Sequence, residues 1–183
     1  MTKAELRREM RTRLAVPDAA REEKSQAIVA ALAGPVAAAG GRWIALFSPM
    51  PGEPDVELLW ETGAGRFCYP RVAKGGMEFV EVEKLVDLIA APWHPHIREH
   101  RLAEARVVPP GEIGVILVPG LAFTKQGRRL GRGGGFYDRY LTALPAAVRK
   151  IGVCFAMQLV ESLPIEAHDQ QMDVVVTEAG LAA

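Results

Sequence analysis

The sequence has little cysteine, no excess of charge and no long apolar run. It contains two cysteines, Cys68 and Cys154, so a disulfide framework or a CxxC-type zinc site is excluded. Lys and Arg number 22, as do Asp and Glu, so no net charge favours nucleic acid or an anionic membrane. No segment approaches the roughly 18 apolar residues that span a bilayer, and the charged N-terminus lacks a signal-peptide core. We therefore expect a cytoplasmic protein with no nucleic-acid or membrane partner.

The remaining composition is that of an ordinary globular protein, with 49% hydrophobic and 24% charged residues in 183 positions. This length predicts a single domain over residues 1–183. Apolar periodicity predicts a helix over 2–15 and, after a break at Pro17 and Asp18, a second helix that ends near Ala33. Short apolar runs predict strands, whereas residues 85–110 are expected to be irregular. The predicted strands are 43–47, 66–72, 77–82, 115–118, 151–156 and 174–177. Their alternation with helices favours a layered α/β domain with a largely parallel sheet.

The strongest functional signal is a glycine- and arginine-rich stretch, Pro119 to Tyr140, which follows a buried strand and opens a helix. Glycines let backbone N–H groups approach an anion, and a helix N-terminus adds partial positive charge. Arg128, Arg129 and Arg132 supply guanidinium groups suited to phosphate oxygens. The stretch matches neither the Walker loop nor the G-x-G-x-x-G loop. A flexible loop with solvated arginines is the alternative, but the density of arginine before a helix favours phosphate binding.

Carboxylates beside this stretch suggest a metal site. Asp138 either stabilises the first turn of its helix or holds Mg²⁺ with phosphate oxygens, and its spacing favours neither. Residues 158–173 contain four carboxylates and His168, which form either a metal or acid–base site or a capped turn. Asp173, just before the last predicted strand, is the better placed of these to share a cation with Asp138.

Weaker candidates lie elsewhere in the chain. Glu53 follows the first strand and could bind N–H donors of a pterin-like ring, and Asp55 could cap the following helix. Lys3 and Arg7, four residues apart on one helix face, either contact phosphates or are solvated. His94 and His96 have metal-ligand spacing, but Pro95 makes a regular strand there unlikely.

The stretch Pro119 to Leu141 closely resembles the signature of the 5-formyltetrahydrofolate cyclo-ligase family, also called methenyltetrahydrofolate synthetases. The similarity includes Pro-Gly-x-x-Phe and the run from Arg129-Leu130-Gly131 to Tyr137-Asp138. Further matches cover almost the whole chain in order. They are Lys3-x-x-Leu6-Arg7, Met50-Pro51-Gly52-Glu53, and Leu163-Pro164-x-Glu166-x-His168-Asp169 with Asp173.

This resemblance implies a three-layer α/β/α single domain with a mixed, largely parallel sheet. It also implies a ligase in which ATP, with Mg²⁺, phosphorylates the formyl oxygen of 5-formyltetrahydrofolate. The resulting iminophosphate would cyclise to 5,10-methenyltetrahydrofolate without a covalent enzyme intermediate. Positioning and charge neutralisation dominate such phosphoryl transfer. The partner implied is therefore a reduced folate, bound by a monomer or homodimer.

By the same resemblance, Asp138 and Asp173 would hold Mg²⁺, and Glu53 and Phe136 would bind the folate. Arg132 would stabilise charge, and Tyr137 would lie between nucleotide and folate, both with catalytic roles. The residues that the resemblance assigns to ATP are Lys3, Arg7, Arg128, Arg129, Gly131, Arg132, Gly133, Gly134, Gly135, Phe136 and Tyr137.

The chain departs from the family pattern at two places. Many members have Tyr where Phe136 stands, and the family segment Gly-Ile-x-Glu-Pro is reduced to Ile97-Arg98-Glu99, without the proline. Two other functions are compatible with the glycine–arginine stretch. One is a different ATP-dependent enzyme on the same scaffold, and the other is a module that binds nucleotide or RNA. Neutral charge and the lack of interleaved aromatics count against the second.

Overall fold

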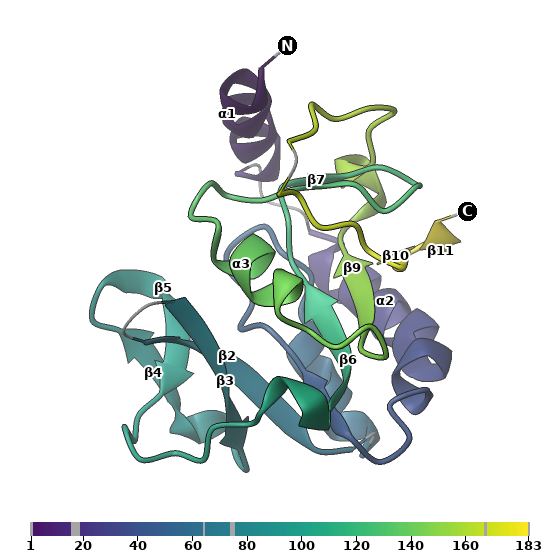
Figure 1. Cartoon of the computed structure of the whole chain (residues 1–183). Coiled ribbons are helices and arrows are strands. Elements are labelled where there is room, and N and C mark those ends of the chain that lie inside the picture. The colour runs from purple at the N-terminus through teal and green to yellow at the C-terminus, as the bar shows by residue number, and fades with distance from the viewer. Residues whose placement is uncertain (1, 16–18, 64, 74–75, 167, 183) are drawn as a thin grey trace.

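A mixed seven-stranded sheet forms the centre of the molecule (Figure 1). The computed structural model describes residues 2–15, 19–63, 65–73, 76–166 and 168–182, so the predicted break at Pro17 and Asp18 lies outside the described residues. In spatial order the strands are β11 (Gly180–Ala182), β10 (Val174–Thr177), β9 (Arg149–Val153), β6 (Ile113–Val118), β1 (Trp43–Ala45), β2 (Phe67–Ala73) and β3 (Gly76–Val82). The inner strands are parallel, and the edge strands β11 and β3 pair antiparallel. The predicted mixed, largely parallel sheet is confirmed.

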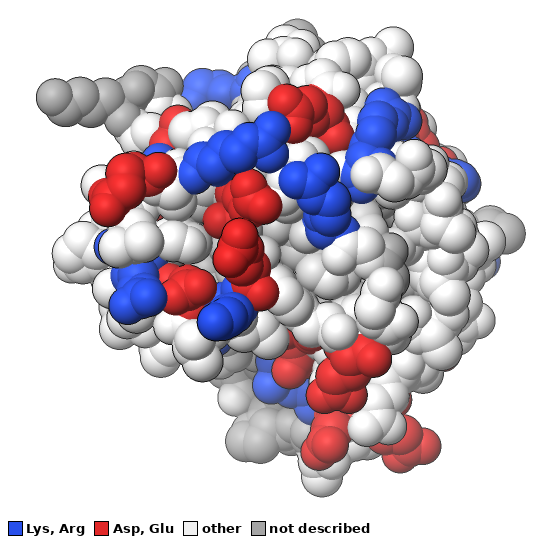
Figure 2. Space-filling view, turned by 90° about the horizontal axis from the view of Figure 1, so that it is seen from below, with Lys and Arg blue, Asp and Glu red and all other residues white. Residues whose placement is uncertain are grey.

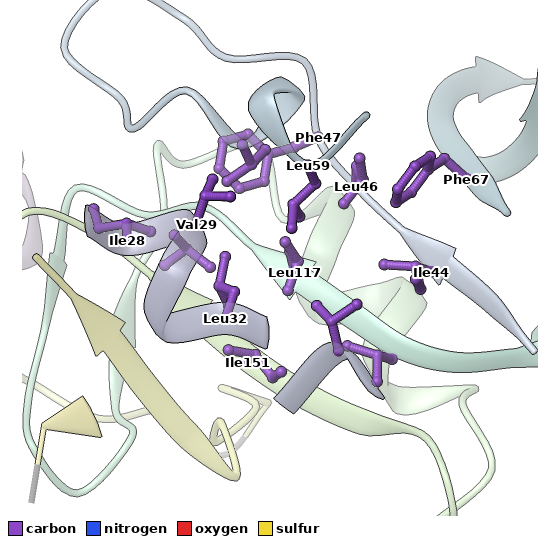
Figure 3. Close-up of a cluster of buried hydrophobic side chains, with 14 of the residues drawn as sticks. Ile28, Val29, Leu32, Ile44, Leu46, Phe47, Leu59, Phe67, Leu117 and Ile151 are labelled. Carbon is purple, nitrogen blue, oxygen red and sulfur yellow. The ribbon is translucent and has the colours of Figure 1, made fainter. Parts of the chain in front are cut away.

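Helices cover both faces of this sheet. The helix α2 (Arg21–Ala37) places Ile28 and Leu32 against Leu117 and Ile151 of the sheet, in the first core cluster (Figure 3). On the other face, α3 (Phe136–Thr142) buries Leu141 in the second cluster. The alternation of strand side chains between faces supplies both clusters with apolar groups. The predicted three-layer arrangement is therefore confirmed.

The N-terminal helix α1 (Lys3–Leu14) packs away from the sheet, beside a small two-stranded element made of β7 (Ala122–Phe123) and β8 (Arg129–Leu130) (Figure 1). Thr2 caps it through a capping box with Glu5. Leu6 and Met10 are buried against this small element. Their spacing of four residues puts both on one helix face.

The prediction of irregular structure over 85–110 is wrong. The strands β4 (Leu88–Ala91) and β5 (His94–His100) form an antiparallel hairpin, flanked by the 3₁₀ turns η2 (Leu85–Asp87) and η3 (Pro110–Glu112). Pro95 fits because the register shifts where β5 begins, and proline is tolerated at bulges and edges.

Smaller differences concern element ends. The helix α2 continues past its predicted end at Ala33 to Ala37, with Pro35 inside its last turns. Burial of Pro35 and Val36 offsets the backbone hydrogen bond that the proline cannot make. The region 56–62 is the 3₁₀ helix η1 (Val56–Thr62), and a further 3₁₀ turn is η4 (Ala156–Gln158). None of the helices in the described ranges is both long and apolar enough for a membrane span.

The sheet changes direction between β1 and β6. From β1 the chain moves to β2 on one side, whereas β6, β9 and β10 follow on the other. Where the connections after two neighbouring parallel strands lead in opposite directions, a crevice opens at the carboxyl edge of the sheet. Proteins of the α/β class bind their ligands in such a crevice. Ser48 after β1 and Pro119 after β6 lie at that edge.

Candidate active site

A pocket of about 630 Å³ lies at this edge of the sheet, lined by both Ser48 and Pro119. Several other parts of the chain contribute to it. They are helix α1, the Met50 and Glu53 loop, strands β2 and β3, the β4–β5 hairpin, and the loops that contain residues 129–138 and 166–169. Most of the predicted site residues therefore meet in one pocket.

The glycine–arginine loop supplies one wall. Arg129 and all the predicted residues between Gly131 and Asp138 line the pocket. Gly133 and Gly135 have φ angles of +111° and +66°, which side-chain-bearing residues rarely adopt. The loop therefore needs glycine to turn toward α3. Because α3 has seven residues, we expect only a small contribution from its dipole.

Helix α1 supplies three cations from one face, at positions 3, 7 and 11. Arg7 Nε donates to the carbonyl of Gly131 at 3.0 Å, and Arg11 Nη2 donates to the carbonyl of Arg132 at 2.9 Å. No carboxylate of the described residues pairs with either guanidinium. Sequence reasoning missed Arg11, although its spacing of four residues from Arg7 was a usable signal.

Lys3, unlike Arg7 and Arg11, is paired with carboxylates. Its ammonium contacts both carboxylate oxygens of Asp169, at 2.8 and 2.7 Å, and lies 3.3 Å from Glu166. Partial burial raises the pKa of Asp169, but the hydrogen bonds from Lys3 and from the Glu166 N–H outweigh this and lower it overall. Asp169 accepts the N–H of Glu166, so the capped-turn reading of this segment is the one observed. Glu166, His168 and Asp169 could together ligate a metal, but the ammonium of Lys3 already contacts two of them.

Arg129 and Asp138 form a pair at the floor of the pocket. The Arg129 side chain is 3% exposed, and Nη2 donates to Asp138 Oδ1 at 2.6 Å. Nη1 donates to the Pro119 carbonyl at 3.3 Å, whereas Nε has no hydrogen-bond partner among the described residues. The second oxygen of Asp138 accepts no hydrogen bond in the described part of the chain. It is therefore available to a ligand in the pocket.

Asp173 and Arg128 are not among the residues that line the pocket. The Asp173 carboxylate accepts the backbone N–H of Lys150 at 2.7 Å, at the start of β9. Its other oxygen lies 4.0 Å from the Lys150 ammonium. Asp173 is thus held beside β9, and the expected cation site shared by Asp138 and Asp173 stays a prediction.

Arg132 and Glu53 pair across the pocket. Glu53 is 3% exposed, and its Oε1 accepts hydrogen bonds from Arg132 Nε and Nη2 at 3.0 and 2.7 Å. The N–H of Met50 donates to Oε2 at 3.0 Å, and Arg21 donates twice to the Glu53 carbonyl. Both side chain and backbone of Glu53 are therefore held in place.

The Tyr137 hydroxyl is buried and has no hydrogen-bond partner among the described residues. Burial raises the pKa of Tyr137, and the charge of Glu53 raises it further, so the phenol stays protonated at neutral pH. A buried hydroxyl without a partner is unfavourable unless a ligand completes its hydrogen bonding. Since Tyr137 and Phe136 both line the pocket, the hydroxyl is a candidate ligand contact.

Comparison with known proteins agrees with the arrangement of these motifs. The sequence model of the 5-formyltetrahydrofolate cyclo-ligase family matches residues 1–178. The chain belongs to this family. The 5-formyltetrahydrofolate cyclo-ligase of Mycolicibacterium smegmatis is 33% identical to it, over 92% of this chain and 89% of that protein. The predicted family and the prediction of a ligase-type enzyme are confirmed.

Solved structures of the family share the fold. The 5,10-methenyltetrahydrofolate synthetase of Aquifex aeolicus superposes with a TM-score of 0.84 at 30% identity, covering 99% of this chain and 92% of that one. The corresponding synthetase of Mycoplasma pneumoniae gives 0.76 at 25% identity, covering 97% and 99%. The likeness therefore extends over nearly the whole chain.

Proposed function

We propose that this protein catalyses the ATP- and Mg²⁺-dependent cyclisation of 5-formyltetrahydrofolate to 5,10-methenyltetrahydrofolate, with release of ADP and phosphate. One observation carries the proposal. A single pocket is lined both by the glycine–arginine loop, which suits phosphates, and by the buried carboxylate of Glu53, which suits the N–H groups of a pterin. Two substrates bound there would meet.

The chemistry needs no enzyme nucleophile. The formyl oxygen attacks the γ-phosphorus of ATP, and the bond to the ADP oxygen breaks. The neighbouring arylamine nitrogen then attacks the activated carbon and gives up its proton, which leaves with the phosphate that carries the former formyl oxygen. This sequence depends on positioning and charge neutralisation. Arg7 and Arg11, which no described carboxylate neutralises, are the best suited of the pocket cations to hold phosphate oxygens.

The residues present fit a magnesium ion held through Asp138. One oxygen of Asp138 is free of described hydrogen bonds, and Mg²⁺ commonly takes one or two carboxylates with phosphate oxygens and waters. Bound there, the ion would neutralise charge on the transferred phosphoryl group. Arg129 orients Asp138 in the same pocket. Arg132 is the cation that lies directly beside the loop glycines in the sequence.

Glu53 and Tyr137 are proposed to bind the folate. Glu53 has both oxygens engaged but retains acceptor capacity, because a carboxylate offers about four lone-pair sites. The Tyr137 phenol would donate to a folate or formyl oxygen. Phe136 offers ring surface beside it.

The proposed partner is a small molecule rather than a polyanion. On the face seen from below, basic and acidic side chains of the described residues are interleaved (Figure 2). Nucleic-acid sites instead gather basic groups along one face. A cytoplasmic location and a monomeric or homodimeric state stay predictions.

The direct test mixes the purified protein with 5-formyltetrahydrofolate, ATP and Mg²⁺ and follows the near-ultraviolet absorbance of the methenyl product. We expect a rise that requires both ATP and Mg²⁺. ADP release with another acceptor, and no methenyl product, would reject the folate while keeping the nucleotide. Absence of both would reject the proposed function.

A further inference from the structure

The β4–β5 hairpin forms a wall of the pocket, yet its own strands bury little apolar surface. The two strands pair only with each other, in a sheet separate from the central one. Among their residues, only Leu88 and Ala91 are buried. An isolated two-stranded hairpin is marginally stable in water, so contacts to the rest of the molecule must fix its position.

Arg98 makes the main polar contact between β5 and the carboxyl edge of the sheet. Its Nε donates to Ser48 Oγ at 2.9 Å, and its Nη2 donates to the carboxylate of Glu57. Ser48 follows β1 and Glu57 lies in η1. One guanidinium therefore joins the hairpin to two separate segments beside the central sheet. Planar guanidinium groups suit such multiple contacts because their donors are held in a fixed geometry.

The carboxylate side of this contact is largely shielded from water, whereas the Arg98 side chain is 35% exposed. Glu57 is 13% exposed, and burial raises its pKa even though Arg98 acts to lower it. Loss of Arg98 would leave a partly buried carboxylate without its cation. The neighbouring Glu99 accepts the N–H of Val72 in β2 at 2.8 Å, which gives the hairpin a second polar anchor.

We propose that Arg98 is a positioning residue that holds the hairpin as the folate-side wall of the pocket and thereby sets the affinity for the reduced folate. The hairpin lies beside β2 and β3, away from α1, which carries Arg7 and Arg11 (Figure 1). Ser48, which Arg98 contacts, precedes the loop that presents Glu53. The inference rests on the proposed function for the identity of the ligand, but the anchoring of the hairpin does not.

The kinetic test compares Arg98→Ala, Arg98→Lys and Glu57→Gln with a matched control, Arg101→Ala. Arg101 lies just after β5 and pairs with Asp87 at 2.9 Å, but it is 55% exposed and does not line the pocket. We expect Arg98→Ala to raise the KM for 5-formyltetrahydrofolate about tenfold, with the KM for ATP unchanged. Arg98→Lys keeps the charge but loses the fork, so its KM should be intermediate. Arg101→Ala should behave as the unmodified protein.

Hydrogen exchange separates this inference from the proposed function. Amides of residues 88–100 should exchange faster in Arg98→Ala than in Arg101→Ala, while those of β6 and β9 stay protected. Unchanged exchange in the hairpin would overturn the anchoring role, whether or not the protein makes the methenyl product. An equal rise in the KM for both substrates would show a general loss of structure and would also overturn the inference. A protein without cyclo-ligase activity but with faster hairpin exchange would refute the proposed function and, with it, the role in folate affinity.

Discussion

The guanidinium of Arg132 donates two hydrogen bonds to one oxygen of Glu53, a residue 79 positions earlier in the chain. The pair joins the glycine–arginine loop to the loop after β1. Glu53 is buried, whereas the side chain of Arg132 is 34% exposed toward the pocket. A ligand can therefore reach the guanidinium, but Glu53 depends on it for charge compensation.

Removing either member of this pair should cost stability, and removing both should cost less than the sum. We expect Arg132→Gln to lower the free energy of unfolding by about 2 kcal/mol, because the Glu53 carboxylate loses its cation. The double variant with Glu53→Gln should recover part of that loss. Urea unfolding of both single variants and the double variant measures the coupling. Strict additivity would contradict an energetic link between the two residues.

Arg7 and Arg11 should act on nucleotide affinity. Each donates to a carbonyl of the glycine–arginine loop and retains further donors for phosphate oxygens. We expect Arg7→Ala and Arg11→Ala each to raise the KM for ATP about tenfold, because charge-assisted hydrogen bonds are lost. Steady-state kinetics with ATP varied makes the measurement. Arg8→Ala is the matched control, because Arg8 lies on the same helix but does not line the pocket. A comparable KM in all three variants would argue against a phosphate-binding face.

Asp138 and Asp173 should respond differently to the loss of their charge. Asp138→Asn should abolish most turnover and its dependence on Mg²⁺, because a neutral amide is a poor ligand for this ion. Asp173→Asn should retain a Mg²⁺-dependent activity, since its carboxylate is engaged by the Lys150 backbone. Titration of activity against Mg²⁺ compares them, and circular dichroism checks that each is folded. Equal loss of the Mg²⁺ response in both variants would instead support a two-carboxylate site.

Tyr137 and Tyr140 offer a comparison of two buried hydroxyls. Neither has a hydrogen-bond partner among the described residues, but only Tyr137 lines the pocket. Deleting an unpaired buried hydroxyl removes a desolvated polar group, so both Phe variants should gain up to about 1 kcal/mol of stability. We expect only Tyr137→Phe to lose turnover, because its phenol would contact the substrate. Thermal unfolding and the methenyl assay measure the two effects. Full activity of Tyr137→Phe would remove the hydroxyl from the mechanism.

Sequence spacing was sufficient for several features that depend on neighbours along the chain, although not for the β4–β5 hairpin. The helix expected over 2–15 is α1, the apolar run at 115–118 lies within the buried strand β6, and the glycines from 131 to 135 form the turn before α3. These follow from local backbone preferences and from side-chain periodicity. The family motif rests on the same kind of local pattern.

Only the tertiary structure decided which charged groups meet. Lys3 contacts Asp169 at a separation of 166 residues, and Arg98 contacts Glu57 at a separation of 41. Such pairs depend on the strand order and on how loops leave the sheet, which no local pattern encodes. Asp173 is another example. Its position in the sequence predicted a site shared with Asp138, but its carboxylate accepts a backbone N–H from β9. The sequence by itself determined the chemistry available to this protein, and packing of distant segments decided which groups share the pocket.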